Sequence, residues 1–560
     1  MILSEMQQKV KNENLDAYLV EYGNHFIGQD ILPKEHKLKY LCGFSGSAGM
    51  LAVTKNRAYL FVDGRYELQS RQEVDLQKVE VVDAAPSLKN VCTYLAEQNL
   101  KRIGYDGMNL TAGELQTVQT DFPNLVFTDT GDWLQINNAA EIEVKERKTK
   151  YSGLTAVEKI NGVKYLLNRY MADYFLFTAA DSVSWLLNIY ARDLKCSPVV
   201  RAYALVKADG SCVLVGDNLQ TTKFEVWSFE KFLNWLSNTE AHILYDACTI
   251  PDKVKKLLKN GQSVPDCCQF QKAEKNGVEL NGMIACHKRD GVALVKLLCW
   301  LEQNWQDKTE LEVVAKLHQL RKEQNLFFCE SFETIAGTAE NGAVVHYQPT
   351  EKSNKKLQKN NLLLIDSGGQ YLDGTTDVTR TVALGEPSKE MIHNFTLVLK
   401  GHISLAQAVF PVGTSGIQLD ALARLPLWRE GKDFKHGTGH GVGCFGNVHE
   451  GPNRISAKGS IYGFKPNMIT SIEPGYYKEN AYGIRIENLV YSKISEKYAG
   501  FLEFAPLTLV PIDKKLIDVY LLEQGEQDWL NNYHRKVYES LAACVNDDEK
   551  KWLKESCSPL

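Results

Sequence analysis

The alternation of apolar and polar residues predicts two similar α/β units in the first half of the chain. Residues Met50–Asp63 have the pattern of a hairpin: an apolar strand, a polar turn and a second apolar strand. The same pattern returns at Tyr203–Val215, and similar apolar strings, at 14–20 and 171–177, precede the two hairpins. We therefore expect two related α/β domains in tandem; the alternative is a chance likeness between short apolar strings. The charged stretch Glu141–Lys150 is interpreted as a linker between them.

The second half of the chain has a different pattern. Apolar residues recur at helical spacing across Gly282–Leu320, which predicts helix there. After Phe332 the chain becomes rich in glycine, histidine and acidic residues, and every chemical motif that we find lies between His346 and Glu487. Beyond Pro511, apolar residues at helical spacing predict a docked helix; they are Trp529, Tyr533, Val537 and Leu541.

The composition indicates a large globular protein of several domains. The 560 residues are too many for one core, and 44% hydrophobic with 24% charged residues is ordinary for such proteins. A net charge of -5 predicts no attraction to nucleic acid or to an anionic membrane. No apolar run is long enough to cross a bilayer, and residues 1–14 lack the apolar core of a secretory signal. The thirteen cysteines are scattered, without a Cys-x-x-Cys motif, so we expect free thiols and a cytoplasmic location.

Two aspartates flank a predicted hairpin. Asp366 ends an apolar strand, and Asp377 lies in a threonine-rich strand after the turn dipeptide Asp373-Gly374. A strict two-residue turn there pairs Asp377 with Gln370, which leaves Asp366 four residues away, about 13 Å. For both aspartates to reach one metal pair, the strand must bend, and Gly368-Gly369 is where a bulge fits. The alternative is two unrelated surface aspartates.

Three histidines follow in glycine-rich chain. His436 and His440 are four residues apart, but the glycines of His436–Gly443 would each cost about 1 kcal/mol inside a helix. The glutamate that follows the first histidine in helical zinc proteases is also missing. We therefore expect an extended, closely approached backbone. His449 follows soon after, and three histidines so close together favour a functional site over isolated, satisfied polar residues.

Two glutamates lie among isoleucines in predicted strands. Glu473 and Glu487 are expected to be buried, and buried glutamates are rarely left unpaired. Alternation along the strand places Arg485 on the same face as Glu487. A buried salt bridge between Arg485 and Glu487 is therefore an alternative, but it leaves Glu473 and the two aspartates unexplained.

Together these residues predict a dinuclear metal site. Four carboxylates and one imidazole suit two divalent ions, with Mn²⁺ the best fit and Zn²⁺, Co²⁺ or Fe²⁺ as alternatives. The four negative charges nearly offset two such ions that share a hydroxide, whereas without metal the carboxylates would repel one another. The expected ligands are Asp366, Asp377, His440, Glu473 and Glu487.

These segments, in this order, resemble those of the pita-bread metallopeptidases, which include methionine aminopeptidase, prolidase and aminopeptidase P. In that family Asp, Asp, His, Glu and Glu bind two metal ions, and all five are matched here. Further segments resemble aminopeptidase P in particular: 44–49, 62–66, 331–335, 341–347, 507–513 and 529–534.

The resemblance implies a fold and a domain organisation. It implies an α/β and α+β protein with two creatinase-type domains at 1–145 and 146–271. A pita-bread catalytic domain at 272–505 and a docked C-terminal segment at 506–560 would follow. It further implies a homodimer.

The resemblance also implies the reaction and its residues. The expected reaction is hydrolysis of the bond between the first residue of a peptide and a proline in second position, by attack of a metal-bridging hydroxide. Glu473 is expected to accept a proton from that hydroxide. The resemblance implies that His346, His436 and His449 contact substrate or help move protons. The alternatives are a prolidase, which cuts Xaa-Pro dipeptides and usually has one amino-terminal domain, and a non-catalytic pita-bread binding module.

Overall fold

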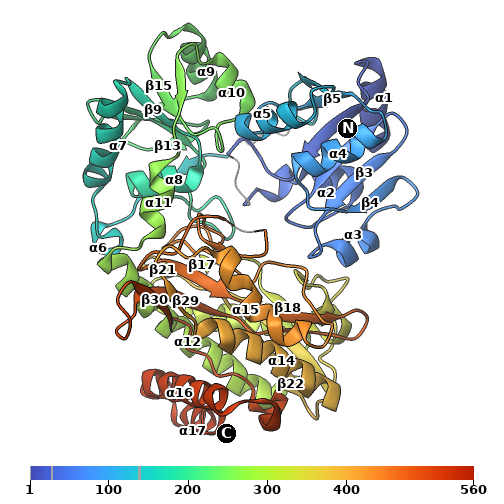
Figure 1. Ribbon diagram of the computed structural model, residues 1–560, viewed down its shortest axis with the longest axis vertical. Helices are drawn as coiled ribbons and strands as arrows, with labels where there is room; N and C mark the ends of the chain where they lie inside the picture. The colour runs from blue at the N-terminus through green and yellow to red at the C-terminus, as the bar shows by residue number, and fades with distance from the viewer. Residues whose placement is uncertain (1, 27–29, 136–139, 459) are drawn as a thin grey trace. The chain divides into compact units, whose positions relative to one another are not determined.

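The computed structural model describes residues 2–26, 30–135, 140–458 and 460–560 (Figure 1). The chain forms two compact units. The first comprises Met1–Thr149, Leu154–Leu194 and Pro198–Cys268, and the second comprises Lys150–Gly153, Lys195–Ser197 and Gln269–Leu560. Within the described ranges, no helix has both the length and the apolar character needed to cross a membrane.

The first unit contains two six-stranded sheets of the same topology. One has the order β4 (Val79–Asp83), β3 (Ala58–Val62), β2 (Met50–Thr54), β1 (Ala17–Glu21), β5 (Arg102–Tyr105), β6 (Val126–Asp129). The other has the order β14 (Glu225–Trp227), β12 (Cys212–Val215), β11 (Tyr203–Lys207), β9 (Tyr174–Phe177), β15 (Ile243–Tyr245), β16 (Gly261–Ser263). Corresponding neighbours are parallel or antiparallel in the same way in both sheets. The two predicted hairpins and the prediction of two related α/β domains are therefore confirmed.

Helices accompany both sheets (Figure 1). In chain order they are α1 (Leu3–Asn12), α2 (Lys37–Cys42), α3 (Glu67–Glu73), α4 (Leu88–Glu97), α5 (Ala112–Asp121), α7 (Ala156–Tyr170), α8 (Ala180–Leu187), α9 (Phe229–Asn238) and α10 (Asp252–Leu257). Two more, α6 (Thr149–Ser152) and α11 (Cys267–Ala273), lie where the chain passes between the units. Local sequence sets their starts: Thr155 and Glu158 form a capping box that begins α7.

The charged stretch Glu141–Lys150, which the sequence analysis interprets as a linker, is structured. Its first half forms β7 (Ile142–Glu143), which pairs with β13 (Leu219–Gln220), and β8 (Lys145–Glu146), which pairs with β10 (Ile189–Tyr190). Backbone pairing with distant short strands fixes this segment, and charge composition alone does not reveal such pairing.

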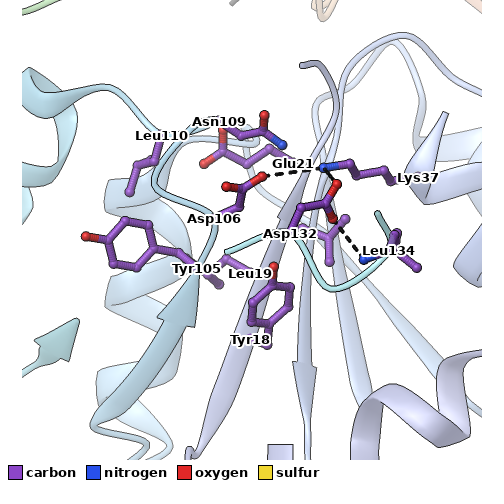
Figure 2. Close-up of a pocket in the computed structure, with 11 residues that line it drawn as sticks. Tyr18, Leu19, Glu21, Lys37, Tyr105, Asp106, Asn109, Leu110, Asp132 and Leu134 are labelled. Carbon is purple, nitrogen blue, oxygen red and sulfur yellow. Dashed lines mark hydrogen bonds and ion pairs between the residues drawn. The ribbon is translucent and has the colours of Figure 1, made fainter. Parts of the chain in front are cut away.

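A small polar pocket lies at the carboxyl ends of β1 and β5 (Figure 2). Lys37 forms ion pairs there with Asp106 and Asp132, at 3.7 and 3.1 Å. Burial raises the pKa of Glu21, which also lines the pocket, well above its ordinary value. This edge of an α/β sheet is where ligands often bind, but the cavity holds only about 10 Å³, room for about one water molecule. This cavity is too small for a peptide.

The second unit combines small antiparallel sheets with long helices. The helices are α12 (Gly277–Asn304), α13 (Glu310–Lys322), α14 (Lys389–Ala406) and α15 (Gly416–Trp428). The predicted helical stretch 282–320 is thus two helices, because a 3₁₀ turn at Trp305–Asp307 intervenes and Thr309 caps α13. Leucines and valines of α12 and α13 pack against β19 and β22 in one apolar cluster.

Five small sheets complete this unit. Their strand orders are β17 (Phe327–Glu330), β20 (Gly369–Tyr371), β21 (Gly374–Thr375); β18 (Ile335–Thr338), β19 (Asn361–Ser367), β22 (Val378–Leu384); β23 (Val409–Pro411), β30 (Phe501–Pro506), β29 (Asn488–Ile494), β26 (Ile469–Ile472); β24 (Gly439–His440), β25 (Arg454–Ile455); and β27 (Gly475–Lys478), β28 (Tyr482–Arg485).

The predicted C-terminal helix is confirmed. It is α16 (Gln524–Leu541), and α17 (Asp547–Ser556) follows it. Tyr533, Val537 and Leu541 are buried in a cluster that also contains residues of α12 and α14, whereas Trp529 is partly buried against it. All thirteen cysteines lie within the described ranges, and none of them forms a disulfide.

Candidate metal centre

The two aspartates lie on one hairpin of the second unit. In β19 and β22, Asp366 pairs with Thr379, and in β20 and β21, Tyr371 pairs with Gly374. Both pairings follow a single register, so the turn is at Leu372–Asp373. The predicted turn at Asp373-Gly374 was therefore wrong. Part of the reason is non-local, because Arg289 of α12 forms an ion pair with the Asp373 carboxylate.

The observed register brings the aspartates together without a bulge. It places Asp377 opposite Gly368, two positions from the pair of Asp366 and Thr379. Positions two apart share a face of the hairpin and lie about 7 Å apart, not 13 Å. The expected bulge at Gly368-Gly369 is therefore unnecessary, since no residue is inserted between the two paired segments.

The two glutamates lie on a second hairpin. β26 pairs with β29, and β27 pairs with β28, again in one register. Continuing that register across the gap places Glu473 opposite Glu487. Thr379 joins this hairpin to the first one, because its hydroxyl donates to Glu487 Oε2 at 2.8 Å and its carbonyl accepts from the Glu487 N–H at 3.1 Å.

His440 approaches from an extended segment, as predicted. Its N–H donates to Ser471 Oγ at 2.9 Å, which lays β24 along β26. The approach is so close that a Cβ on Gly439 would lie 2.0 Å from the Ser471 carbonyl oxygen. His440 Nε2 is 3.5 Å from both Asp377 Oδ2 and Glu473 Oε1. The structure thus brings His440 to the carboxylates.

The donor atoms of this cluster fit divalent metal ions. Asp366 Oδ1, Asp377 Oδ1 and Glu487 Oε1 are buried and have no hydrogen-bond partner among the described residues. His440 Nδ1 lies 3.0 Å from the Gly441 carbonyl oxygen, which can only accept, so the proton is on Nδ1 and the Nε2 lone pair faces the carboxylates. One possible ligand atom from each of Asp377, His440 and Glu487 lies within 4.8 Å of the others.

The electrostatics of the cluster also indicate that it can bind divalent cations. Burial raises the pKa of Asp377, Glu473 and Glu487, and the charge of neighbouring carboxylates raises each of them further. Ionised carboxylates in such a place need positive charge close by. Oxygen donors with one imidazole nitrogen are what hard or borderline divalent ions prefer.

Arg485 forms its ion pair with Asp366 and not with Glu487. Its Nη2 donates to Asp366 Oδ2 at 2.6 Å, and its Nε donates to Thr379 Oγ1 at 3.1 Å. The alternative of a salt bridge between Arg485 and Glu487 is therefore wrong. The partner comes from β19, far away in the sequence, so alternation within one strand does not reveal it.

Of the three further histidines, His449 contacts a ring of this cluster, whereas His436 and His346 are connected to it through neighbouring residues. The His449 ring lies edge-on to the His440 ring, with centroids 4.3 Å apart. His436 Nδ1 donates to the Gly437 carbonyl, so its Nε2 accepts from the Tyr477 hydroxyl at 2.8 Å. Tyr477 in turn accepts from Arg485 at 2.6 Å. His346 follows Val345, whose carbonyl accepts from Arg485 Nη2 at 3.2 Å.

Tyr477 and Thr379 are site residues that the sequence did not single out. Burial raises the pKa of Tyr477 to about 12, so its hydroxyl stays protonated at neutral pH and can donate to His436. Tyr477 shares the segment of Glu473, and Thr379 follows Asp377 by two positions. Closeness in sequence to the expected ligands is the only feature that could have predicted these two site residues, since neither tyrosine nor threonine is typical of a metal site.

Family models match almost the whole chain. The Creatinase/Prolidase N-terminal domain matches twice, at residues 3–136 and 138–279. Metallopeptidase family M24 matches residues 281–493, and the C-terminal region of peptidase M24 matches 500–560. The expected fold, two creatinase-type domains followed by a pita-bread domain, is thereby confirmed.

Individual proteins match over their full length. A probable Xaa-Pro aminopeptidase P of Laccaria bicolor is 34% identical over 100% of this chain and 93% of its own. A Xaa-Pro aminopeptidase of Caenorhabditis elegans is 35% identical over 97% of this chain and 95% of its own.

Solved structures agree with these matches. The crystal structure of an X-prolyl aminopeptidase from C. elegans, a cytosolic enzyme with a di-nuclear active site, has 33% identity and a TM-score of 0.92 over 98% of this chain and 95% of its own. A prolidase of Pyrococcus horikoshii, 21% identical with a TM-score of 0.52, shares the fold over 63% of this chain and 99% of its own. This chain belongs to metallopeptidase family M24, in the group of the Xaa-Pro aminopeptidases P.

Proposed function

We propose that this chain is a two-metal aminopeptidase that removes the first residue of peptides with proline in second position. The observation that carries the proposal is the convergence of four carboxylates and one imidazole from two hairpins and a glycine-rich segment. The full-length similarity to Xaa-Pro aminopeptidases supports the substrate class.

The residues that would hold the two ions are Asp366, Asp377, His440, Glu473 and Glu487. Bound divalent ions supply a water molecule of lowered pKa and a Lewis acid for the scissile carbonyl. We propose Mn²⁺ as the native metal because oxygen donors predominate, with Zn²⁺, Co²⁺ and Fe²⁺ as alternatives.

The protein's own groups would hold and move protons. Glu473 can take a proton and pass it to the proline nitrogen, which leaves only when protonated. We propose that His449, whose ring lies edge-on to that of His440, binds the carbonyl oxygen or relays that proton. His436, with its Nδ1 proton committed to Gly437 and its Nε2 to Tyr477, is suited to fix the Tyr477–Arg485 pair. For His346 we propose a contact with substrate.

Proline would be recognised by its shape. It has no amide hydrogen and its ring fixes φ, so a pocket can select the ring and the bent chain.

The decisive assay compares Xaa-Pro, Xaa-Pro-Yaa and Xaa-Ala-Yaa peptides with Mn²⁺ present. We expect cleavage of the first bond in Xaa-Pro-Yaa. Preference for the dipeptide would make the chain a prolidase, equal cleavage of the alanine peptide would exclude proline specificity, and no cleavage of any peptide would favour a binding module.

The architecture favours aminopeptidase over prolidase. The prolidase of P. horikoshii shares its fold with 63% of this chain, whereas the C. elegans aminopeptidase matches 98%.

We also propose a cytoplasmic homodimer. Exposed apolar side chains on α15, Leu425 and Trp428, support an interface, and sedimentation of the purified protein tests it.

A further inference from the structure

Arg380 is a fully buried arginine whose hydrogen-bond partners are uncharged. It lies in β22 and only 1% of it is exposed. Within the described part of the chain, it donates hydrogen bonds to the carbonyls of Thr379 (2.8 Å), Glu487 (2.6 Å), Val510 (2.7 Å) and Pro511 (3.0 Å), to Asn488 Oδ1 (2.7 Å) and to the Tyr533 hydroxyl (2.8 Å). A guanidinium buried without a bonded carboxylate is costly, and burial lowers the pKa of Arg380.

The partners of Arg380 come from two parts of the molecule. Glu487 and Asn488 belong to the hairpin of the metal centre, whereas Val510 and Tyr533 belong to the C-terminal segment. Arg380 holds the Glu487 carbonyl, while the preceding residue, Thr379, holds the Glu487 N–H and Oε2. The backbone of Glu487 is therefore fixed on both sides by two adjacent residues of β22.

Tyr533 connects α16 to the same point. Its hydroxyl accepts from Arg380 and donates to the Val510 carbonyl at 2.8 Å. Its ring stacks on Trp529, with centroids 5.4 Å apart. Trp529 lies 5.8 Å from His402, whose Nδ1 is 3.1 Å from the carbonyl oxygen of Ile472. The helix is thus connected through Arg380 to the carbonyl of Glu487. It is also connected through His402 to Ile472, the residue before Glu473.

We propose that Arg380 and Tyr533 are positioning residues through which the C-terminal segment holds Glu487 in place for metal binding. The inference rests on the proposed function, in which Glu487 is a metal ligand. Groups that orient a ligand typically change metal affinity 10–100-fold when they are removed. The C-terminal segment would then be a part of the metal centre's support and not only a cover for apolar surface.

The test compares two tyrosines of α16 in the full-length chain. Tyr533→Phe removes the hydroxyl that bonds Arg380, and Tyr538→Phe removes one from a partly buried neighbour on the same helix. Both proteins are stripped of metal, and the Mn²⁺ dissociation constant is measured by competition with a fluorescent chelator. Thermal unfolding of the metal-free proteins is measured in parallel. We expect roughly tenfold weaker Mn²⁺ binding for Tyr533→Phe and no change for Tyr538→Phe.

Two further variants make the outcomes distinguishable. Arg380→Lys keeps the charge but replaces Nη1 and Nη2, which bond Glu487 and Tyr533 separately, with a single nitrogen. We therefore expect a larger loss of Mn²⁺ affinity. If this variant does not fold, Tyr533→Phe alone is the test. Unchanged Mn²⁺ affinity in Tyr533→Phe, with or without a lower unfolding temperature, overturns the inference if Glu487→Gln weakens binding. Unchanged affinity in Glu487→Gln itself overturns the proposed ligand, and the inference with it.

Discussion

Glu473 and Glu487 lie opposite each other in one antiparallel hairpin, at the gap between its two paired segments. Like charges directly opposite each other destabilise a hairpin. Burial also raises the pKa of both groups, so their ionisation is costly without a cation. Positive charge between the strands, or a proton on one of the two groups, therefore stabilises the arrangement.

Removing one of these charges should separate metal binding from folding. Glu487→Gln should abolish activity and reduce metal content from about two ions per chain. The metal-free variant should be at least as stable as the metal-free wild type, because one of two opposed charges is gone. Elemental analysis and thermal unfolding measure the two effects. Full activity of exhaustively chelated wild-type protein would contradict the metal requirement.

The glycines around the histidines offer a matched pair of variants. A Cβ on Gly439 would lie 2.0 Å from the Ser471 carbonyl oxygen, whereas at Gly437 the nearest atom is 3.6 Å away. Gly439→Ala should push β24 away from β26 and move His440, with a loss of activity of about 100-fold or more for a displacement near 1 Å. Gly437→Ala should retain activity. Steady-state kinetics with both variants test this, and equal activities would show that the segment adjusts freely.

The five residues proposed as ligands stand out in the sequence because of their residue types and settings. A carboxylate at the end of an apolar strand is conspicuous, and the glycines around His440 exclude a helix. The predictions that were wrong concern strand register and turn position, which depend on contacts between residues far apart in the sequence. The turn dipeptide Asp373-Gly374 favours one register locally, but the pairing of whole strands sets another. Tertiary contacts override local turn preference here.

The supporting residues were less predictable for a similar reason. Arg485 is two residues from Glu487 in the sequence. It nevertheless bonds Asp366, which is brought close only by the packing of two hairpins. Tyr477 and Arg380 form hydrogen bonds with groups on other strands. Their residue types are common in cores, so the pattern along the chain does not distinguish them from packing residues.

A buried carboxylate next to His449 should be important for stability. Glu450 lies 3.1 Å from Lys272 Nζ and 3.4 Å from Lys275 Nζ, and all three side chains are buried. Glu450→Gln leaves the two ammonium groups without this charge and should lower the free energy of unfolding of the second unit by about 3–5 kcal/mol.

The control is a pair near the surface. Lys493 and Glu503 are 2.8 Å apart and both partly exposed, so Glu503→Gln should cost about 1 kcal/mol or less. Denaturant unfolding followed by a probe in the second unit measures both variants. Equal losses would show that burial of the Glu450 cluster contributes little.

His449 should act in the reaction without binding metal. Its ring contacts His440, but it is not among the expected ligands. His449→Ala should retain about two metal ions while turnover falls by about 10²–10⁴, the usual contribution of a group that transfers protons. His393→Ala, at a histidine that bonds Glu430, serves as the control. Unchanged turnover would remove His449 from the mechanism, and loss of metal would make its role structural.

The last prediction concerns acid stability and depends on His534 of α16. This histidine is fully buried, and its Nε2 accepts from the Ile512 N–H at 3.0 Å, which requires a neutral ring. Burial, and to a smaller extent the charges of Lys514 and Arg380, lower the pKa of His534 to about 3. The folded protein therefore binds fewer protons here than the unfolded chain, whose histidine has a pKa near 6.5. The stability that neutral His534 contributes is fully present above about pH 6.5 and is lost as the pH falls toward 3, at about 1.4 kcal/mol per pH unit.

A glutamine at position 534 separates this effect from other acid transitions. In His534→Gln, the amide oxygen can accept from Ile512, but the side chain does not titrate. Metal ligands and other carboxyl groups also take up protons between pH 7 and 4, and they do so equally in both proteins. The difference in unfolding free energy between wild type and variant therefore isolates His534. It should shift in favour of the variant as the pH falls from 7 to 4, whereas a difference independent of pH would show that His534 is not held neutral.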